Sequence, residues 1–252
     1  MKRLLAAVAC LLALCACGQA QPEETTSITT VPQTTTEAPT TTQLPTLPAI
    51  EYPDSYKDAP KEYKPILDDL YKFVYVLVND ILIDENELFG ETGFADAPSY
   101  AFSFGAFQHG YVGYAIQDIN SDGVPELLLL NKEETILSFF TLKDNKPVHL
   151  GGYARRVYCR GIAADGTIHT GGSSSAASGV NEIYKLEPHA AELTFVVRHD
   201  YDYWPPEEVD TYHKEVDGVG EDITEEDYKA IAKKYADPEK SPMKLNFISI
   251  EQ

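Results

Sequence analysis

Apolar side chains recur at helical spacing near the start of the folded region. Between residues 60 and 83 they occupy Ile66, Leu67, Leu70, Phe73, Val74, Leu77, Val78 and Ile81. This spacing places them along one face of an α-helix. Pro60 and Pro65 fall early in the stretch, where a missing backbone N–H costs little. The pattern therefore predicts an N-terminal helix over 60–83 with one buried face.

From Tyr111 onward the apolar pattern changes to the short runs of β-strands. The expected strands are 112–116, 127–130, 135–142, 147–150, 156–163, 167–170, 180–186 and 193–203. Turn-forming residues separate them, and Asp144-Asn145 and Asp165-Gly166 are typical of hairpin turns. Short strands at this spacing predict an antiparallel β-meander.

A second helix and a final strand are predicted after the meander. Thr224 can cap a helix that begins with three acidic residues, 225–227, whose charges favour the positive end of the helix dipole. Residues 244–250 have the pattern of a strand. With a helix first, strands in the middle, and a helix and a strand last, the sequence predicts an α+β fold. We expect one globular domain over 51–252.

The first residues resemble the signal peptide of a bacterial lipoprotein. Two basic residues precede the apolar stretch 4–14, which suits a secretory signal and is too short to cross a membrane. The segment Leu14-Cys15-Ala16-Cys17-Gly18 matches the lipobox, with Leu three positions before the modified cysteine and a small residue directly before it. The resemblance implies that 1–16 is cleaved and that Cys17 is lipidated, so that the chain is anchored outside the bacterial cell membrane. An ordinary secretory signal with incidental cysteines is the alternative.

Residues 17–50 are expected to form a disordered tether that begins at the lipidated cysteine. Residues 21–50 contain eleven Thr and five Pro, and such a composition buries too little apolar surface to offset the entropy of ordering. Pro-rich chain extends by about 3.1 Å per residue, so the tether can hold the domain many tens of ångströms from the membrane. The composition also permits O-glycosylation.

The whole chain is acidic, with 20 basic against 40 acidic side chains and a net charge of −20. This balance argues against nucleic acid as a partner, whose phosphates need Lys and Arg, and against docking of the domain itself on an anionic membrane surface. Within 51–252 a single cysteine, Cys159, remains. We expect it to be a buried, small apolar residue rather than a nucleophile, because no catalytic signature flanks it.

The most specific chemical motif lies between residues 118 and 126. Side-chain oxygens occupy its first, third, fifth and ninth positions, and Gly123 at the sixth permits a turn. The expected ligands of a Ca²⁺ ion are Asp118, Asn120, Asp122, the backbone carbonyl of Val124, and Glu126. A set with oxygen ligands alone selects a hard cation. We expect structural Ca²⁺; a metal-free turn and a catalytic metal are the alternatives.

This loop resembles a known kind of calcium turn. It is not an EF-hand, because Leu129 stands where that loop needs a bidentate Glu. It is similar to the calcium turns of FG-GAP and VCBS repeats, although the motif occurs once here and not in the several copies of a propeller. The order of lipobox, tether, helix, loop, hairpin (140–148) and Gly/Ser-rich loop (171–179) also resembles uncharacterised surface lipoproteins of gut Clostridia. That resemblance implies no particular activity.

Aromatic and acidic side chains alternate at the end of the strand predicted over 193–203. Tyr201, Tyr203 and Trp204 are candidates for contact with a sugar or a cationic peptide, through stacking or cation–π attraction. No catalytic constellation stands out, so we expect a calcium-stabilised module that binds an extracellular glycan or protein. A cell-surface hydrolase acting on polysaccharide or peptide is the alternative, and a role in envelope assembly without a small ligand is a third.

Overall fold

The structure, a computed structural model of the whole chain, describes residues 54–57, 59–79, 112–153, 156–173, 175–202, 209–216 and 219–250. All of these belong to the unit Leu44–Gln252. The predictions made for 1–50, including lipidated Cys17, and for Tyr203 and Trp204 lie outside the described residues. No helix in the described part of the chain is long and apolar enough to cross a membrane.

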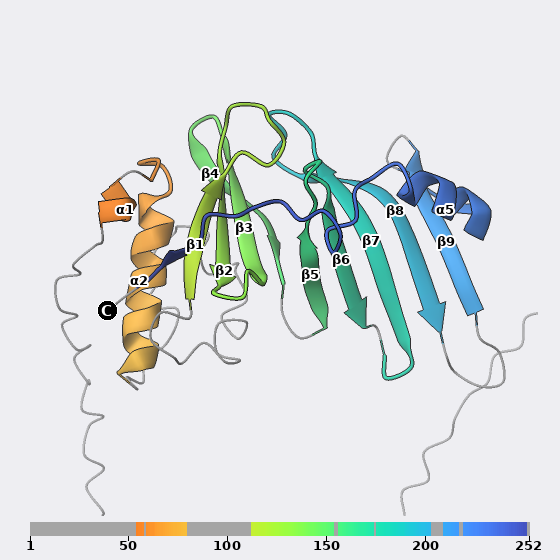
Figure 1. Cartoon of the computed structure of the whole chain (residues 1–252), viewed down its shortest axis with the longest axis horizontal. Helices are drawn as coiled ribbons and strands as arrows, with labels where there is room; N and C mark the ends of the chain where they lie inside the picture. The colour runs from red at the N-terminus through yellow and green to blue at the C-terminus, as the bar shows by residue number, and fades with distance from the viewer. Residues whose placement is uncertain are drawn as a thin grey trace, which may run out of the picture. The chain divides into compact units, whose positions relative to one another are not determined.

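The first sheet is preceded by helices α1 (Asp54–Lys57) and α2 (Lys64–Val78). Its strands follow the order β11-β1-β2-β3-β4. Their bounds are β1 (Val112–Gln117), β2 (Glu126–Asn131), β3 (Ile136–Lys143), β4 (Lys146–Gly152) and β11 (Ile248–Ser249). All neighbouring strands of this sheet pair antiparallel. Figure 1 shows α2 beside this sheet and β11 at the edge formed by β1.

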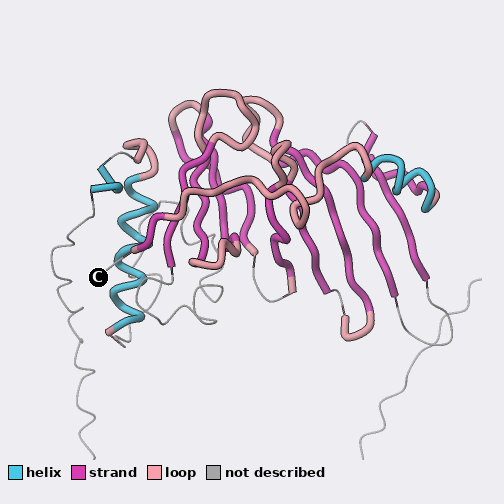
Figure 2. Tube along the Cα trace, in the orientation of Figure 1, coloured by secondary structure: helices cyan, strands magenta, loops and turns pink. Residues whose placement is uncertain are grey.

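The second sheet follows the order β10-β9-β8-β7-β6-β5, again with antiparallel pairs throughout. Its strands are β5 (Val157–Ile162), β6 (Ile168–Ser173), β7 (Ser178–Leu186), β8 (Leu193–Asp202), β9 (Val209–Val216) and β10 (Val219–Ile223). Helix α5 (Glu225–Ala232) comes next. After it, the chain returns to the first sheet as a long loop segment that ends in β11 (Figure 2).

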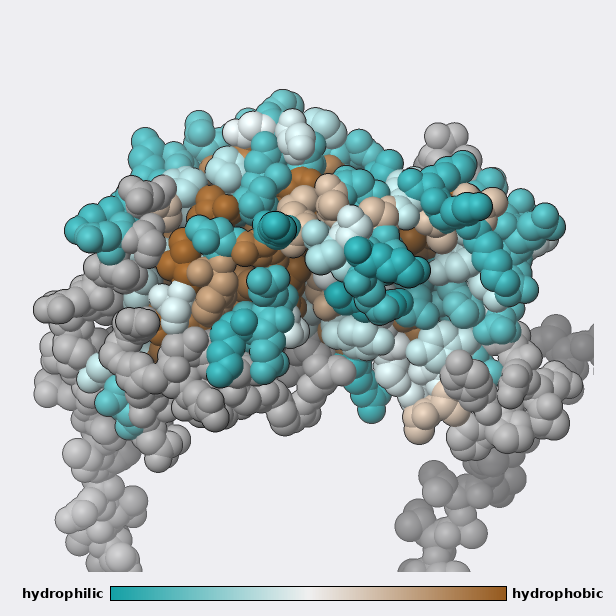
Figure 3. All heavy atoms as spheres, in the orientation of Figure 1, coloured by the Kyte–Doolittle hydropathy of each residue, from teal (hydrophilic) through white to brown (hydrophobic). Residues whose placement is uncertain are grey.

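The apolar run Leu127–Leu130 is explained by burial on both faces of the first sheet. Leu127 and Leu129 belong to a core cluster with residues of α2. Leu128 and Leu130 belong to a second cluster that includes residues of β5 and β6. Because side chains alternate along a strand, β2 is apolar at each of these positions and separates the two cores. On the face seen in Figure 3, hydrophobic residues gather around the first sheet, whereas hydrophilic ones cover most of the second.

Helix α5 lies against one face of the second sheet, at strands β8 and β9. The ring of Tyr228 lies 5.6 Å from that of His199 on β8 and 5.1 Å from that of Tyr212 on β9, measured between centroids. The helix begins where Thr224 accepts a hydrogen bond from the Asp227 N–H at 3.1 Å, so the predicted cap is confirmed. The opposite face of β8 and β9 is not covered by α5.

The predicted order of elements is confirmed, with differences in detail. The described residues are mostly β, with strands divided between two sheets, so the α+β assignment overstated the share of helix. The strand expected over 244–250 is reduced to β11, and β9 and β10 were not predicted. Residues 171–173 and 178–179, expected in a Gly/Ser-rich loop, belong to β6 and β7. Cys159 is buried, as expected.

Candidate functional site

The loop 118–126 connects β1 to β2 and is positioned by their pairing. Gln117, the last residue of β1, is the register partner of Glu126, the first residue of β2. The pairing brings Asp118, at the start of the loop, near Glu126 at its end. The loop therefore lies between two paired strands, in agreement with the strands predicted over 112–116 and 127–130.

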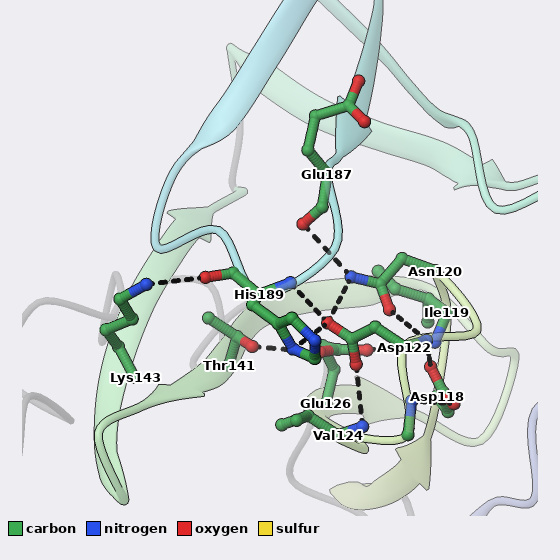
Figure 4. Close-up of polar contacts among 11 residues, drawn as sticks. Asp118, Ile119, Asn120, Asp122, Val124, Glu126, Thr141, Lys143, Glu187 and His189 are labelled. Atoms are coloured by element: carbon green, nitrogen blue, oxygen red, sulfur yellow. Dashed lines mark hydrogen bonds and ion pairs between the residues drawn. The ribbon is translucent and has the colours of Figure 1, made fainter.

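Side chains of the loop accept hydrogen bonds from its own backbone (Figure 4). The two oxygens of Asp118 accept from the N–H groups of Asp122 at 3.1 Å and Gly123 at 2.9 Å. Asp122 accepts from the Val124 N–H at 2.7 Å, and Asn120 from the Asp122 N–H at 3.2 Å. Gly123 has a φ of 86°, a left-handed conformation that glycine adopts without steric cost. The loop is thus a series of turns capped by Asp and Asn side chains.

Glu126 lies fully buried beneath the loop. Its carboxylate accepts hydrogen bonds from the Ile119 N–H at 3.0 Å and the Thr141 hydroxyl at 2.9 Å. Burial raises the pKa of Glu126 to about 7; the charges of Asp122 and Asp118 act in the same direction, and the two hydrogen bonds oppose them. Both donors are neutral, so these contacts bring no positive charge to the buried acid.

The loop also joins the two sheets. Asp122 accepts a hydrogen bond from the backbone N–H of His189 at 2.6 Å, and the Asn120 amide donates to the carbonyl of Glu187 at 3.4 Å. Both partners lie in the β7–β8 turn of the second sheet, as Figure 4 shows. Gly166, in the β5–β6 turn, lies very close to the loop backbone. A Cβ atom on Gly166 would lie 2.2 Å from the carbonyl oxygen of Ile119. Two turns of the second sheet therefore contact the loop.

Asp122 is central to these contacts. Its side chain is 2% exposed, and its Oδ2 lies 3.4 Å from Nδ1 of His189. Burial acts to raise the pKa of Asp122, but hydrogen bonds from the backbone N–H groups of His189 and Val124 outweigh it and hold the pKa below its ordinary value. Asp122 is therefore a nearly buried carboxylate that is charged at neutral pH.

The donor set of the loop suits a hard cation. It contains three carboxylates, two of them buried, together with an amide oxygen and the Val124 carbonyl, and no nitrogen or sulfur ligand. The oxygens of Asp118 and Asp122 face backbone N–H groups, and no three His, Cys, Asp or Glu side chains within the described ranges are grouped so as to hold a metal ion. Binding an ion would therefore require the carboxylates to turn away from these N–H groups.

The predicted ligand-binding residue Tyr201 lies far from the loop along β8. It is the register partner of Gly179, and a Cβ on Gly179 would lie 2.2 Å from the Tyr201 hydroxyl oxygen. The tyrosine ring therefore lies across the glycine. The loop contacts the turn before β8, whereas Tyr201 is near the other end of this strand, so the structure does not bring the two predicted sites together.

Comparison with known proteins identifies no family. No protein-family model and no curated protein sequence matches the chain. Among solved structures, a Xanthomonas type IV secretion system related protein is similar at 15% sequence identity and a TM-score of 0.32. The alignment covers 48% of this chain and 61% of that one. The site must therefore be interpreted from its own geometry.

A groove on the second sheet was not predicted from the sequence. Its volume is about 450 Å³, and it is lined by Glu182, Tyr184, Phe195, Arg198, Asp200, His213 and Gly220. We refer to it as the β7–β10 groove. Arg198 and His213 alternate along their strands with His199 and Tyr212, which face α5. The groove therefore lies on the face of the sheet opposite to α5.

Charged side chains cross this groove in one row. Successive register partners on β6 to β10 are Thr170, Glu182, Arg198, His213 and Asp222. Arg198 donates to Glu182 at 3.3 Å and, through two nitrogens, to Asp200 at 2.7 and 2.5 Å. His213 lies 3.4 Å from Asp200 and 2.8 Å from Asp222. The row is visible only once the strand register is known, because its members are far apart in the sequence.

Proposed function

We propose that the chain is an extracytoplasmic, lipid-anchored binding module whose folded unit is stabilised by Ca²⁺ held in the loop 118–126. The lipobox at Cys17 and the Thr/Pro-rich tether support the location. One observation carries the calcium part of the proposal. Two buried carboxylates, Asp122 and Glu126, belong to an all-oxygen loop at the place where the two sheets meet.

A cation in this loop would add to the stability of the whole unit. It would supply the full positive charge that the neutral donors around Glu126 lack, and it would act on contacts shared by both sheets. Extracellular calcium sites bind with dissociation constants of about 10⁻⁴–10⁻³ M. At about ten times the dissociation constant, binding to the native state alone stabilises it by about 1.4 kcal/mol. The residues that would hold the ion are Asp118, Asn120, Asp122, Val124 and Glu126.

Thermal unfolding of the full-length chain in detergent, followed by circular dichroism, tests this proposal. We expect millimolar Ca²⁺ to raise the Tm by about 3–6 °C relative to chelator, since this is the shift that about 1.4 kcal/mol gives at this size. Asp122→Ala should lower the Tm in chelator, because it removes hydrogen bonds between the sheets, and should also abolish the increment due to calcium.

Glu134→Ala is the matched control. Glu134 is an exposed acid with a φ of 60° in the β2–β3 turn, at the end of β2 away from the loop, so its replacement also removes a charge and destabilises a turn. The calcium increment should survive in this variant. An equal increment in both variants, or no increment in the unaltered chain, would contradict the proposal.

A binding role is favoured over hydrolysis by the burial of Glu126. Burial raises the pKa of Glu126 to about 7, as a general acid requires. Its side chain is fully buried beneath the loop, where a polysaccharide or peptide could not reach it. A cell-surface hydrolase is therefore an alternative function that Glu126 does not support.

A further inference from the structure

The β7–β10 groove carries more negative charge than its arginine cancels. Of its lining residues, Glu182 and Asp200 contribute two carboxylates, and Arg198 contributes one guanidinium. Asp222, whose side chain is 93% exposed, lies outside the lining and 2.8 Å from His213. Arg198 makes a bidentate contact with Asp200. Glu182 receives only a 3.3 Å contact from Arg198 and a 3.2 Å hydrogen bond from the Thr170 hydroxyl. Glu182 is thus the carboxylate with the weaker contact to the guanidinium.

The position of Glu182 makes this charge effective. Its side chain is 15% exposed, so water screens it less than it would a surface acid. The two lining carboxylates exceed the one guanidinium by one negative charge. An arriving cation would therefore be attracted to a site that is already fixed in shape by the contacts of Arg198.

Two aromatic rings form the wall of the groove beside Glu182. The rings of Tyr184 and Phe195 meet edge to face with 5.7 Å between centroids. The face of an aromatic ring attracts a nearby cation by roughly 0.5–1 kcal/mol at exposed sites. Methylene groups next to the cation could pack on the same rings. The wall therefore favours a cation that carries a carbon chain.

Other classes of ligand suit the groove less well. An anion would have to draw Arg198 away from Asp200 and Glu182. A divalent metal needs several free carboxylate oxygens, whereas Arg198 already engages both oxygens of Asp200 and one of Glu182. An alkylammonium group has three N–H donors for carboxylate oxygens and a chain for the aromatic wall.

We infer that the β7–β10 groove binds alkylammonium groups, supplied either by a lysine side chain of a protein or by a free polyamine. This inference names the ligand class of the binding module and so rests on the proposed function. The volume of about 450 Å³ accommodates a lysine side chain or one arm of a polyamine. The net charge of −20 also concentrates cations near the chain.

Isothermal titration calorimetry of the full-length chain in detergent tests the inference with two probes. One is spermidine, and the other is a trilysine peptide with acetylated and amidated ends. The same peptide with acetylated lysine side chains is the uncharged control and should not bind. Tighter binding of the peptide indicates a protein partner, and tighter binding of spermidine a free polyamine; either order supports the inference. No binding of either probe at millimolar concentration would overturn it.

Substitutions separate the groove from the general negative field of the chain. Glu182→Gln keeps the shape of the site and should weaken binding about tenfold or more, which is about 1.4 kcal/mol. Phe195→Leu keeps the wall apolar but removes the ring, and should weaken binding by about two- to fivefold. Circular dichroism measures whether each variant is folded. If one variant does not fold, the other one alone tests the inference.

Glu221→Gln is the matched control for charge. Glu221 lies on β10 and forms an ion pair with Lys214 at 3.5 Å. The two residues are register partners, and their side chains lie on the face of the sheet opposite to the groove. Binding to this variant should stay within about twofold, because a charge on the far face is screened by solvent. Equal losses in Glu182→Gln and Glu221→Gln would overturn the inference, since the probes would then be responding to net charge alone.

Titrations in calcium and in chelator distinguish this inference from the calcium proposal. If the Tm of the folded chain rises with Ca²⁺ but the chain binds neither probe in either buffer, the inference about the groove is overturned. The proposal of calcium stabilisation is then still supported. Binding in both buffers, without an effect of Ca²⁺ on the Tm, would support the groove and contradict the calcium site.

Discussion

A single methyl group at position 166 should strain the junction between the two sheets. Gly166 has a φ of 83°, and an L-residue in the left-handed region costs about 1–2 kcal/mol. In addition, the Cβ of an alanine would lie 2.2 Å from the carbonyl oxygen of Ile119. Overpacking of a well-packed contact costs about 1–3 kcal/mol. Gly166→Ala should therefore destabilise the chain by about 2–5 kcal/mol.

Gly123 offers a matched control within the partner loop. Its φ of 86° is nearly the same, but no atom lies within 4 Å of a Cβ built on it. Gly123→Ala should therefore lower the free energy of unfolding by the backbone cost alone, which is about 1–2 kcal/mol. The difference between the two variants, about 1–3 kcal/mol, isolates the contact between the β5–β6 turn and the loop.

Urea denaturation of both variants, followed by circular dichroism, measures these free energies. The buffer contains chelator, so that an effect of Gly123→Ala on ion binding does not enter the comparison. Equal destabilisation of the two variants would refute the reasoning, because Gly166 would then be required only for its own backbone conformation and not for the approach of the two sheets.

Two further predictions concern titratable groups that do not belong to the loop. Burial acts to raise the pKa of Asp165, but hydrogen bonds from the Thr167 hydroxyl and the Ala236 N–H hold it below its ordinary value of 3.8. The corresponding stability is present above that value and is lost as the pH falls through the native pKa. Asp165→Asn should therefore cost about 1 kcal/mol in urea denaturation at neutral pH and progressively less below about pH 4; an undiminished deficit at about pH 2.5 would argue against it. Burial raises the pKa of Cys159 to about 12, so at about pH 8 its thiol should be alkylated far more slowly in the native than in the unfolded chain. Mass spectrometry of the peptide containing Cys159 measures both rates, and similar rates would mean that it is not in the core.

Features governed by local chemistry were predictable from the sequence. The apolar face of α2, the run Leu127–Leu130 and the cap at Thr224 each follow from spacing or residue type within a few positions. The loop 118–126 was also located correctly between two strands, because its Asp, Asn and Gly residues specify a turn wherever they occur. Its occupancy by Ca²⁺ stays a prediction.

Features that depend on strand register were missed. β9 and β10 have mostly polar side chains, since they lie toward the edge of the second sheet, and they lack the apolar run that marks a buried strand. The glycines of 171–179 were interpreted as a loop. In the paired strands, the rings of Tyr158 and Tyr201 occupy the space where Cβ atoms would be at Gly171 and Gly179. The row across the β7–β10 groove likewise joins residues that only pairing brings together.

The pairing of β11 with β1 has a consequence for the order in which the chain can fold. Gly113 and Tyr114 pair with Ser249 and Ile248, which emerge from the ribosome after the entire second sheet. Until then, the β1 edge presents unpaired backbone groups, which are prone to pair with other chains. This pairing has high contact order, so closure of the first sheet is expected late and slow. The first sheet can therefore gain this edge strand only after both sheets have been translated.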